Sequence, residues 1–405
     1  MTPTATNSVT ALLKNEKVHR AAAYFGETAA QITDRHVKIC SIAAPPFGEG
    51  ERAQFVRQKF VELGLKNARI DREGNVLALR EGRDQHPLLI VSAHLDTVFP
   101  AGTDLTPKFE GTKIFLPGIM DDGCGLAALI ALAEVLEKLA IETEGSILFV
   151  GTVGEEAEGN LRGVRHLLTA GEFAPLVSAF ISLDGAGVDQ IVHRALGSKR
   201  YKVQLNSVGG HSWLDFGAPN PVHALGRAIA KLSAFPLGSA PRTTFNVGKI
   251  AGGASVNAIP TEASMEVDLR SESTDELLRL DAFFRRAIFE AVAEEDAARK
   301  PLYPPLAFDL QITGERPGGA TAPTAELVLL AIDATKALNG APELTISSTD
   351  SNFAMSLDIP AITIGAGGAG DKIHTLGEWY DPTNREIGLQ RALLLILAFV
   401  GLKQI

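Results

Sequence analysis

The sequence predicts an α/β protein in which a mostly parallel sheet lies between helices, an α/β/α arrangement, with a second α+β domain inserted into it. Three apolar runs at 86–96, 145–153 and 178–184 have the length of buried strands, and each ends in or leads directly to acidic or histidine residues. Apolar helical patterns alternate with these runs, which is typical of parallel sheets with helical crossovers. Between 197 and 314 the strand pattern instead alternates apolar and polar residues.

The elements of the first domain follow in chain order. Helical spacing of apolar residues covers 9–41 and 51–63, and the segment 125–139 is apolar on most faces, so we expect a helix buried between sheet and other helices. After the insert, 324–338 predicts a helix, 359–365 an apolar strand and 392–402 a buried C-terminal helix. The first domain is therefore expected to comprise 1–196 and 315–405.

The insert, 197–314, reads as β-α-β-β-α-β, the split βαβ pattern of ferredoxin-like domains. Alternating strands are expected at 199–208, 243–252, 258–271 and 306–313. Helices are expected at 220–235, capped by Asn220, and at 273–298, capped by Ser273 or Thr274.

Composition narrows the function classes. The 405 residues carry a formal net charge of −10 and no long basic run, which argues against a nucleic-acid or anionic-membrane partner. The two cysteines, Cys40 and Cys124, are too few for a disulfide framework, and the N-terminal residues lack an apolar secretory segment. These features predict a cytoplasmic protein.

Five acidic or histidine motifs occur in an order that fits a two-metal site. His94 and Asp96 lie two residues apart at a strand end in "SAHLDTV", so both side chains can point the same way, and a carboxylate there can also orient a metal-bound imidazole. Asp121 and Asp122 lie among glycines in "PGIMDDGCG". An aspartate ahead of a helix is also a normal cap, so one of this pair can cap while the other binds metal.

The remaining motifs of this domain are acidic pairs or single residues at further strand ends. Glu155 and Glu156 follow the strand at 145–153; one can ligate a cation and the other act as general base on a metal-bound water, and the residues alone do not say which. Asp184 ends the next strand, where a turn aspartate is also common. His374 follows a glycine-rich loop whose G-x-G-x-x-G match lacks the helix of a dinucleotide site.

The insert contributes three further candidates. His211 lies in "GGHSW", and Asn257 and Arg270 lie in "GGASVNAIPTEASMEVDLRS". An arginine with an asparagine can recognise a substrate carboxylate, whereas a salt bridge is the ordinary explanation for a strand-end arginine.

Taken together and in order, these motifs resemble the M20 metallopeptidase family, and most nearly its tripeptidase T-like branch. The resemblance covers about residue 42 to the C-terminus. It implies a catalytic domain that binds two zinc ions, or cobalt or manganese in their place, and a ferredoxin-like lid that commonly mediates homodimerisation. It differs at Gly123, where many members carry a lysine that is not a ligand.

The resemblance also implies roles for individual residues. Asp121 would bridge the two metals, with a cis peptide bond to Asp122, and Asp96 would orient His94. One metal would then contact His94, Asp121 and Asp184, and the other Asp121, Glu156 and His374.

The same resemblance implies a reaction. Glu155 would take the proton of the bridging water and pass it to the leaving amine, while His211, reaching the partner subunit's site, would stabilise the oxyanion. Asn257 and Arg270 would hold the backbone end of the substrate.

We therefore expect a zinc-dependent exopeptidase of aminopeptidase or tripeptidase type that acts on short peptides. The alternatives are an N-acyl-amino-acid deacylase or a carboxypeptidase, which use the same metals and base. A catalytically inactive peptide-binding relative is less compatible with an intact Glu155.

Overall fold

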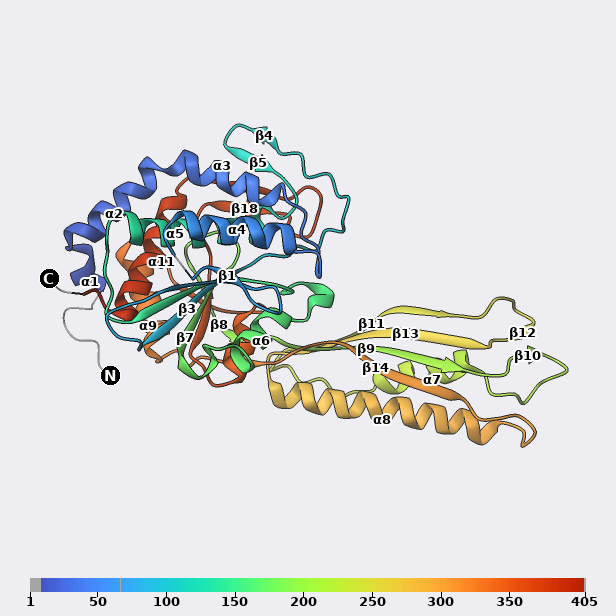
Figure 1. The fold of residues 1–405 in the computed structure, drawn as a ribbon. Coiled ribbons are helices and arrows are strands. Elements are labelled where there is room, and N and C mark those ends of the chain that lie inside the picture. The colour runs from blue at the N-terminus through green and yellow to red at the C-terminus, as the bar shows by residue number, and fades with distance from the viewer. Residues whose placement is uncertain (1–8, 66, 404–405) are drawn as a thin grey trace. The chain divides into compact units, whose positions relative to one another are not determined.

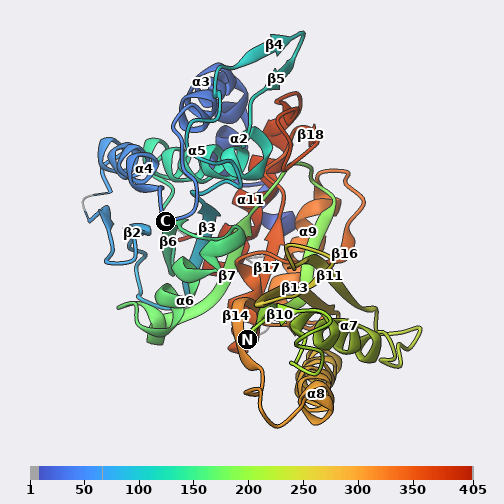
Figure 2. The ribbon, with the colours of Figure 1, turned by 90° about the vertical axis from the view of Figure 1, so that its right-hand side faces the viewer.

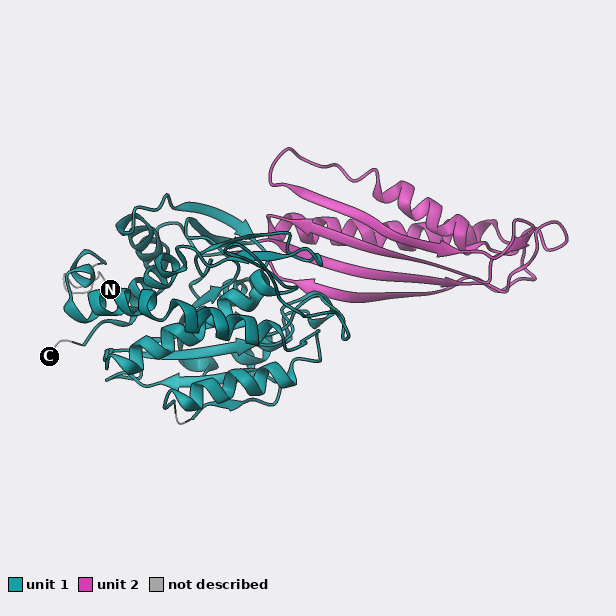
Figure 3. Cartoon of the chain, turned by 90° about the horizontal axis from the view of Figure 1, so that it is seen from above, with its two compact units in different colours: residues 1–195, 320–405 teal, residues 196–319 magenta. Residues whose placement is uncertain are grey.

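The computed structural model describes residues 9–65 and 67–403 and divides the chain into two compact units, 1–195 with 320–405 and 196–319 (Figure 3). Residues 1–8, part of the stretch for which no secretory segment is expected, lie outside the described residues. The second unit extends beyond 314 because its last strand continues to Arg316. Within the described ranges, no helix combines the length and apolarity needed to cross a bilayer.

Unit 1 is built on a nine-stranded sheet (Figure 1). Its central neighbours are parallel, whereas β2 pairs antiparallel with β6 and β8 with β17, so the predicted mostly parallel sheet is confirmed. In spatial order the strands are β1 (Arg69–Ile70), β2 (Val76–Arg80), β6 (Ser146–Thr152), β3 (Leu88–His94), β7 (Val177–Leu183), β17 (Ala361–Ile364), β8 (Gln190–Ala195) and β15 (Gly319–Ala320), with β16 (Glu343–Ser347) also on β8.

Helices bury both faces of this sheet. In β3, Leu89 and Val91 belong to the larger apolar core, which includes helices α1–α5, α9 and α11, while Leu88 and Ile90 belong to a second core with α6 and α10. This double burial explains why the strands read as continuous apolar runs. The helices are α1 (Val9–Leu13), α2 (Glu16–Glu27), α3 (Ala29–Cys40), α4 (Gly50–Glu62), α5 (Cys124–Lys138), α6 (Arg162–Thr169), α9 (Glu326–Ala337), α10 (Ser351–Ser356) and α11 (Arg385–Val400).

A small antiparallel sheet of unit 1 was not predicted. Its strands, in spatial order, are β18 (Ala369–Asp371), β19 (Trp379–Asp381), β5 (Lys113–Phe115) and β4 (Lys108–Glu110). The glycine-rich segment before His374 thus contains a short strand, and β18 and β19 flank the loop that carries this histidine. Figure 2 shows β4 and β5 projecting together from unit 1.

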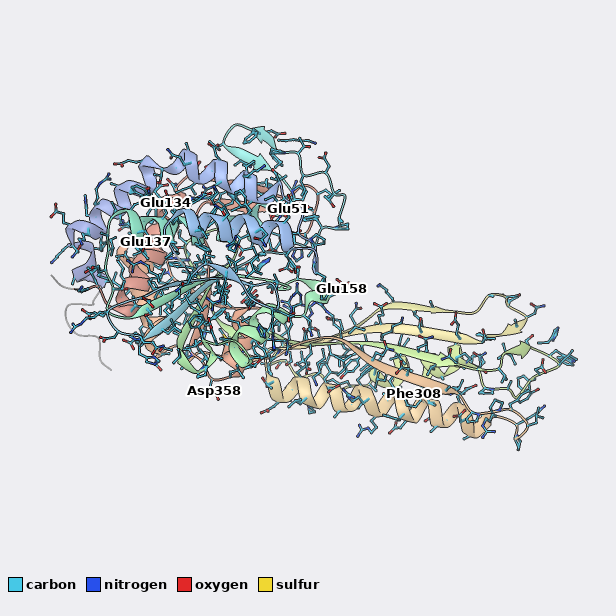
Figure 4. The ribbon with its side chains drawn as sticks, viewed as in Figure 1. Glu51, Glu134, Glu137, Glu158, Phe308 and Asp358 are labelled. Atoms are coloured by element: carbon cyan, nitrogen blue, oxygen red, sulfur yellow. The ribbon has the colours of Figure 1, made fainter. Side chains whose placement is uncertain are left out.

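Unit 2 has the expected ferredoxin-like order. Its four long strands lie as β11-β13-β9-β14, all antiparallel, and α7 and α8 pack on one face through residues such as Tyr201, Val203 and Phe284. Phe308 of β14, labelled in Figure 4, packs edge-on against Phe289 of α8. The elements are β9 (Gly197–Asn206), β10 (Gly210–His211), α7 (Pro221–Leu232), β11 (Thr243–Gly252), β12 (Ala258–Ile259), β13 (Glu262–Ser271), α8 (Thr274–Ala298) and β14 (Ala307–Arg316).

The predicted helix caps of unit 2 are present. Asn220 accepts hydrogen bonds from the N–H groups of Val222 and His223 at the start of α7, and Ser273 accepts one from Glu276 at the start of α8. Such caps satisfy N–H groups that have no partner within the helix, which fixes where each helix begins.

Candidate metal centre

Three parallel strands deliver three of the five candidate ligands to one edge of the sheet. His94 is the last residue of β3, Glu155 and Glu156 follow β6, and Asp184 follows β7. Because β6, β3 and β7 are adjacent and parallel, their carboxyl ends meet, which is where open α/β sheets bind ligands. The strand pairing therefore explains why residues far apart in sequence come together.

Asp121 lies at the centre of this cluster. Its Oδ1 is 2.8 Å from Nε2 of His94, and its Oδ2 is 3.0 Å from Nε2 of His374, so each carboxylate oxygen faces a different imidazole. The Asp121–Asp122 peptide bond is cis, as the resemblance implies.

Glu156 completes the same cluster. Its Oε1 is 2.9 Å from Nε2 of His374, and ligand atoms of His94, Asp121 and Glu156 all lie within 4.8 Å of one another. Imidazole nitrogens and carboxylate oxygens converging at such distances form a donor set that suits zinc and related divalent cations. The residues present therefore fit the metal that the family resemblance implies.

The charges of the cluster also favour a cation. Burial, followed by the neighbouring charge of Asp121, raises the pKa of Asp184 to about 7. The hydrogen bonds with Asp121 and then Glu156 raise the pKa of His374 to about 10. Several buried carboxylates at one point are unfavourable unless positive charge offsets them, which bound cations would do.

Asp96 contacts more than the imidazole of His94. Nδ1 of His94 lies 3.0 Å from the backbone carbonyl of Asp96 and 3.7 Å from its carboxylate. The carboxylate itself accepts the N–H groups of Glu155, at 3.0 Å, and Glu156, at 2.8 Å. Asp96 thus connects the end of β3 to both glutamates, and its closer contact with the imidazole is made through its backbone carbonyl.

Asp122 makes a different set of contacts from Asp121. It is fully buried, and its carboxylate accepts N–H groups from His94 at 3.0 Å and from Gly125, in the first turn of α5, at 3.1 Å. The two aspartates therefore make the different contacts expected of a helix cap and of a candidate metal ligand. Asp122 binds backbone N–H groups at the start of the helix, and Asp121 faces the imidazoles.

Gly123 occupies a position with no room for a side chain. A Cβ there would lie 2.1 Å from Sγ of Cys40, 2.7 Å from the carbonyl oxygen of Gly118 and 3.1 Å from Nε2 of His36. The lysine common in the family at this position would not fit in this chain without displacing Cys40.

The three candidates of unit 2 fall into two places. His211 and Asn257 are both exposed and lie together, because β10 pairs with β12 and the N–H of Ser212 donates to the carbonyl of Asn257. Arg270 lies near the other end of β13, about 25 Å from the end nearest His211 at 3.3 Å per residue, and its Nε donates to Asp268 at 2.6 Å. Within one copy of unit 2, Asn257 and Arg270 therefore cannot hold the same end of one small substrate.

Two residues near the site were not predicted. Glu378 is fully buried and accepts three N–H groups from the segment that carries Asp121. Asp350 is also buried, accepts the hydroxyl of Thr152 at the end of β6, and is one of the charges that raise the pKa of Asp184. Glu378 lies four residues after His374 in the same motif, which was a signal for it, whereas "SSTDS" around Asp350 offered none.

Comparison with known proteins agrees with this architecture. The chain is 29% identical over 230 residues to succinyl-diaminopimelate desuccinylase of Nitrosococcus oceani, covering 53% of this chain and 61% of that one. It is 25% identical over 367 residues to the uncharacterized protein YqjE of Bacillus subtilis, covering 86% and 92%. The crystal structure of a tripeptidase from Staphylococcus aureus shares the fold, with a TM-score of 0.75, 21% identity, and coverage of 91% and 98%.

The family assignment rests on a longer match. The sequence profile of peptidase family M20/M25/M40 matches residues 90–398, which include every candidate ligand from His94 to His374. This chain therefore belongs to peptidase family M20/M25/M40 and is a metallohydrolase of that family.

Proposed function

We propose that the chain is a zinc-dependent exopeptidase that releases residues from the amino end of short peptides, as tripeptidases do. The metal dependence of this proposal rests on one observation: the two carboxylate oxygens of Asp121 face two different imidazoles. His94, Asp121 and Asp184 would hold one cation, and Asp121, Glu156 and His374 the other. Cobalt or manganese would suit the same donors.

Bound divalent cations would supply Lewis-acid polarisation of a carbonyl oxygen and would make water more acidic. The residues of the chain supply the proton transfers. The carboxylate of Glu155 accepts the proton of the attacking water and then donates it to the nitrogen of the leaving amine. Asp96 supports this role, since it binds the N–H of Glu155 and so fixes the backbone from which the base extends.

His211 is proposed to stabilise the oxyanion. Its Nδ1 accepts hydrogen bonds from the N–H groups of Trp213 and Leu214, at 3.2 and 3.4 Å. A neutral imidazole that accepts at Nδ1 carries its proton at Nε2, so the exposed ring presents an N–H donor. Such a donor is what a developing negative charge requires.

The placement of His211 also supports the proposed homodimer. His211 and Asn257 lie together at one end of unit 2, and Arg270 lies near the other. A site that uses all three would draw them from two copies of the chain, with His211 and Asn257 from one lid and Arg270 from the other. We propose that unit 2 is this lid and that it mediates dimerisation.

A second candidate is an N-acyl-amino-acid deacylase. The observation that favours it is the 29% identity, over 230 residues, to a succinyl-diaminopimelate desuccinylase. That reaction cleaves an amide bond and would use the same Glu155 and the same cations.

Hydrolysis of a matched pair of substrates tests both candidates. One substrate is a tripeptide with a free amino end, the other is the same tripeptide after N-acetylation, and each is given to zinc-loaded protein with and without chelator. We expect chelator-sensitive release of the N-terminal residue from the free peptide only. Release of acetate, or of the C-terminal residue, from the acetylated peptide would contradict the aminopeptidase proposal and favour a deacylase or a carboxypeptidase.

A further inference from the structure

Glu378 lies beneath the loop that carries Asp121. Its side chain is fully buried, and its Oε2 accepts the N–H of Gly118 at 2.7 Å. Its Oε1 accepts the N–H groups of Met120, at 2.7 Å, and Asp121, at 3.0 Å. One carboxylate, more than 250 positions away along the chain, therefore holds three N–H groups within four residues of this loop.

The carbonyl groups of the loop are held by a second set of side chains. Nε2 of His36 lies 2.6 Å from the carbonyl oxygen of Ile119, Sγ of Cys40 lies 3.4 Å from that of Gly118, and Sγ of Cys124 lies 2.9 Å from that of Met120. His36 and Cys40 are both fully buried in α3. N–H groups and carbonyls of the loop are thus held by different elements, which leaves its backbone little freedom to move.

The position of Asp121 in the metal centre depends on this backbone. Asp121 faces two imidazoles only while its carboxylate keeps one orientation, and its own N–H is one of the three groups bound by Glu378. Groups that hydrogen-bond to a metal ligand, without binding the metal themselves, orient that ligand and so tune the metal site. What distinguishes Glu378 from other carboxylates that bind backbone N–H groups is that one of its three donors is the N–H of Asp121 itself.

We propose that Glu378 is a positioning residue of the metal centre, acting through the backbone of 118–121 to fix the carboxylate of Asp121 between His94 and His374. The inference rests on the proposed role of Asp121 as a metal ligand. Glu378 makes no contact with substrate in this proposal and acts only through Asp121.

The test compares Glu378→Gln and Glu378→Ala with a matched control. Asp71, in the turn between β1 and β2, also accepts three backbone N–H groups, from Glu73, Gly74 and Asn75, each at 2.9 Å. All three are accepted by Oδ1, so Asp71→Ala removes a similar set of backbone contacts away from the cluster. In Glu378→Gln at least one N–H group loses its acceptor because the new amide group is a donor, and in Glu378→Ala all three lose theirs.

Two measurements are made on each protein. Hydrogen exchange of peptides covering 116–124 is followed in chelated protein, and zinc affinity is measured by competition with a chromophoric chelator. We expect faster exchange in this segment and a zinc affinity weaker by about 10- to 100-fold for Glu378→Gln, with larger effects for Glu378→Ala. Asp71→Ala should raise exchange only around its own turn and leave zinc affinity unchanged.

Each result decides the proposal. Unchanged exchange at 116–124 in Glu378→Gln, or faster exchange with unchanged zinc affinity, would overturn it. A wild-type protein that bound no zinc would instead overturn the proposed function, and the exchange data in chelated protein would still decide whether Glu378 fixes the loop of Asp121. If Glu378→Ala does not fold, Glu378→Gln alone carries the comparison.

Discussion

Apart from the exposed His374, the candidate residues of unit 1 are held more firmly by their surroundings than His211 and Asn257 of unit 2. In unit 1, His94 is 2% exposed and Glu156 6%, and hydrogen bonds from separate strands and loops fix their backbones or rings. In unit 2, His211 and Asn257 are exposed at the end of a sheet. Preorganised groups stabilise a transition state because they need not reorganise during the reaction. In the proposed function, unit 1 would bind metal by itself, whereas turnover would also need the exposed end of unit 2.

Replacement of the proposed base should give the largest effect. Glu155→Ala is expected to lower kcat by about 10²- to 10⁴-fold, because proton transfer loses its carboxylate, while zinc affinity stays close to wild type. Peptide hydrolysis and zinc titration on the same preparation check both parts. Glu158→Ala is the control, since Glu158 is exposed three residues further on and is labelled in Figure 4. Full activity of Glu155→Ala would rule out this assignment.

Replacement of the exposed His211 should distinguish what each unit contributes to turnover and to metal binding. His211→Ala is expected to lower kcat by about 10²- to 10³-fold through loss of an oxyanion donor, again without change in zinc affinity. His223→Ala, on the exposed side of α7, serves as the control. A weaker zinc affinity in His211→Ala would show that His211 contributes to metal binding, contrary to the roles proposed for the two units.

Mixed dimers test whether Glu155 of one chain and His211 of the other act in the same site. Co-expression of Glu155→Ala and His211→Ala chains, each inactive alone, is expected to recover about a quarter of wild-type activity, because half of the dimers are mixed and each mixed dimer has one complete site. Activity that stays at the level of the single variants would place His211 in the site of its own chain or outside the reaction.

In both units, the sequence predicts where some of the candidate residues lie. The strand ends at His94, Glu155 and Asp184 are marked by apolar runs, so their convergence follows from the parallel sheet alone. The separation of Asn257 from Arg270 is likewise implied by the strand expected at 258–271, because Asn257 precedes one end of it and Arg270 lies near the other.

The contacts that hold the backbone of 118–121 could not be predicted from the sequence. Glu378 lies in the same motif as His374, but its three backbone donors lie more than 250 positions away, and backbone donors carry no sequence signal. The short strands β4, β5, β18 and β19 were missed because three residues, several of them exposed, give no apolar period. The long apolar or alternating strands of both units, by contrast, were predicted from their pattern.

Metal removal should affect only one unit. A ligand at 100 times its dissociation constant stabilises a folded protein by about 2.7 kcal/mol, so chelation should lower the unfolding temperature of zinc-loaded protein. Hydrogen exchange resolved by segment should rise after chelation around 94–96, 119–124 and 154–156, and stay constant in β9, β11, β13 and β14. Equal increases in both units would mean that the metal stabilises the chain as a whole.

A pair of glycine substitutions gives the smallest effects and compares the packing of the two regions directly. In Gly123→Ala the new Cβ would meet Sγ of Cys40 at 2.1 Å, which should cost about 1–3 kcal/mol in the free energy of unfolding through overpacking. In Gly226→Ala the new Cβ meets nothing within 4 Å, and the position lies inside α7, so about 0.5–1 kcal/mol of stabilisation is expected. Chemical denaturation measures both.

Adding Cys40→Ala to Gly123→Ala should recover only part of the loss, because the carbonyl of Gly118 still lies 2.7 Å from the new carbon. Full recovery would show that the sulfur alone closes this position, and no loss in Gly123→Ala would show that the loop of Asp121 can shift, contrary to the rigidity that its backbone contacts imply.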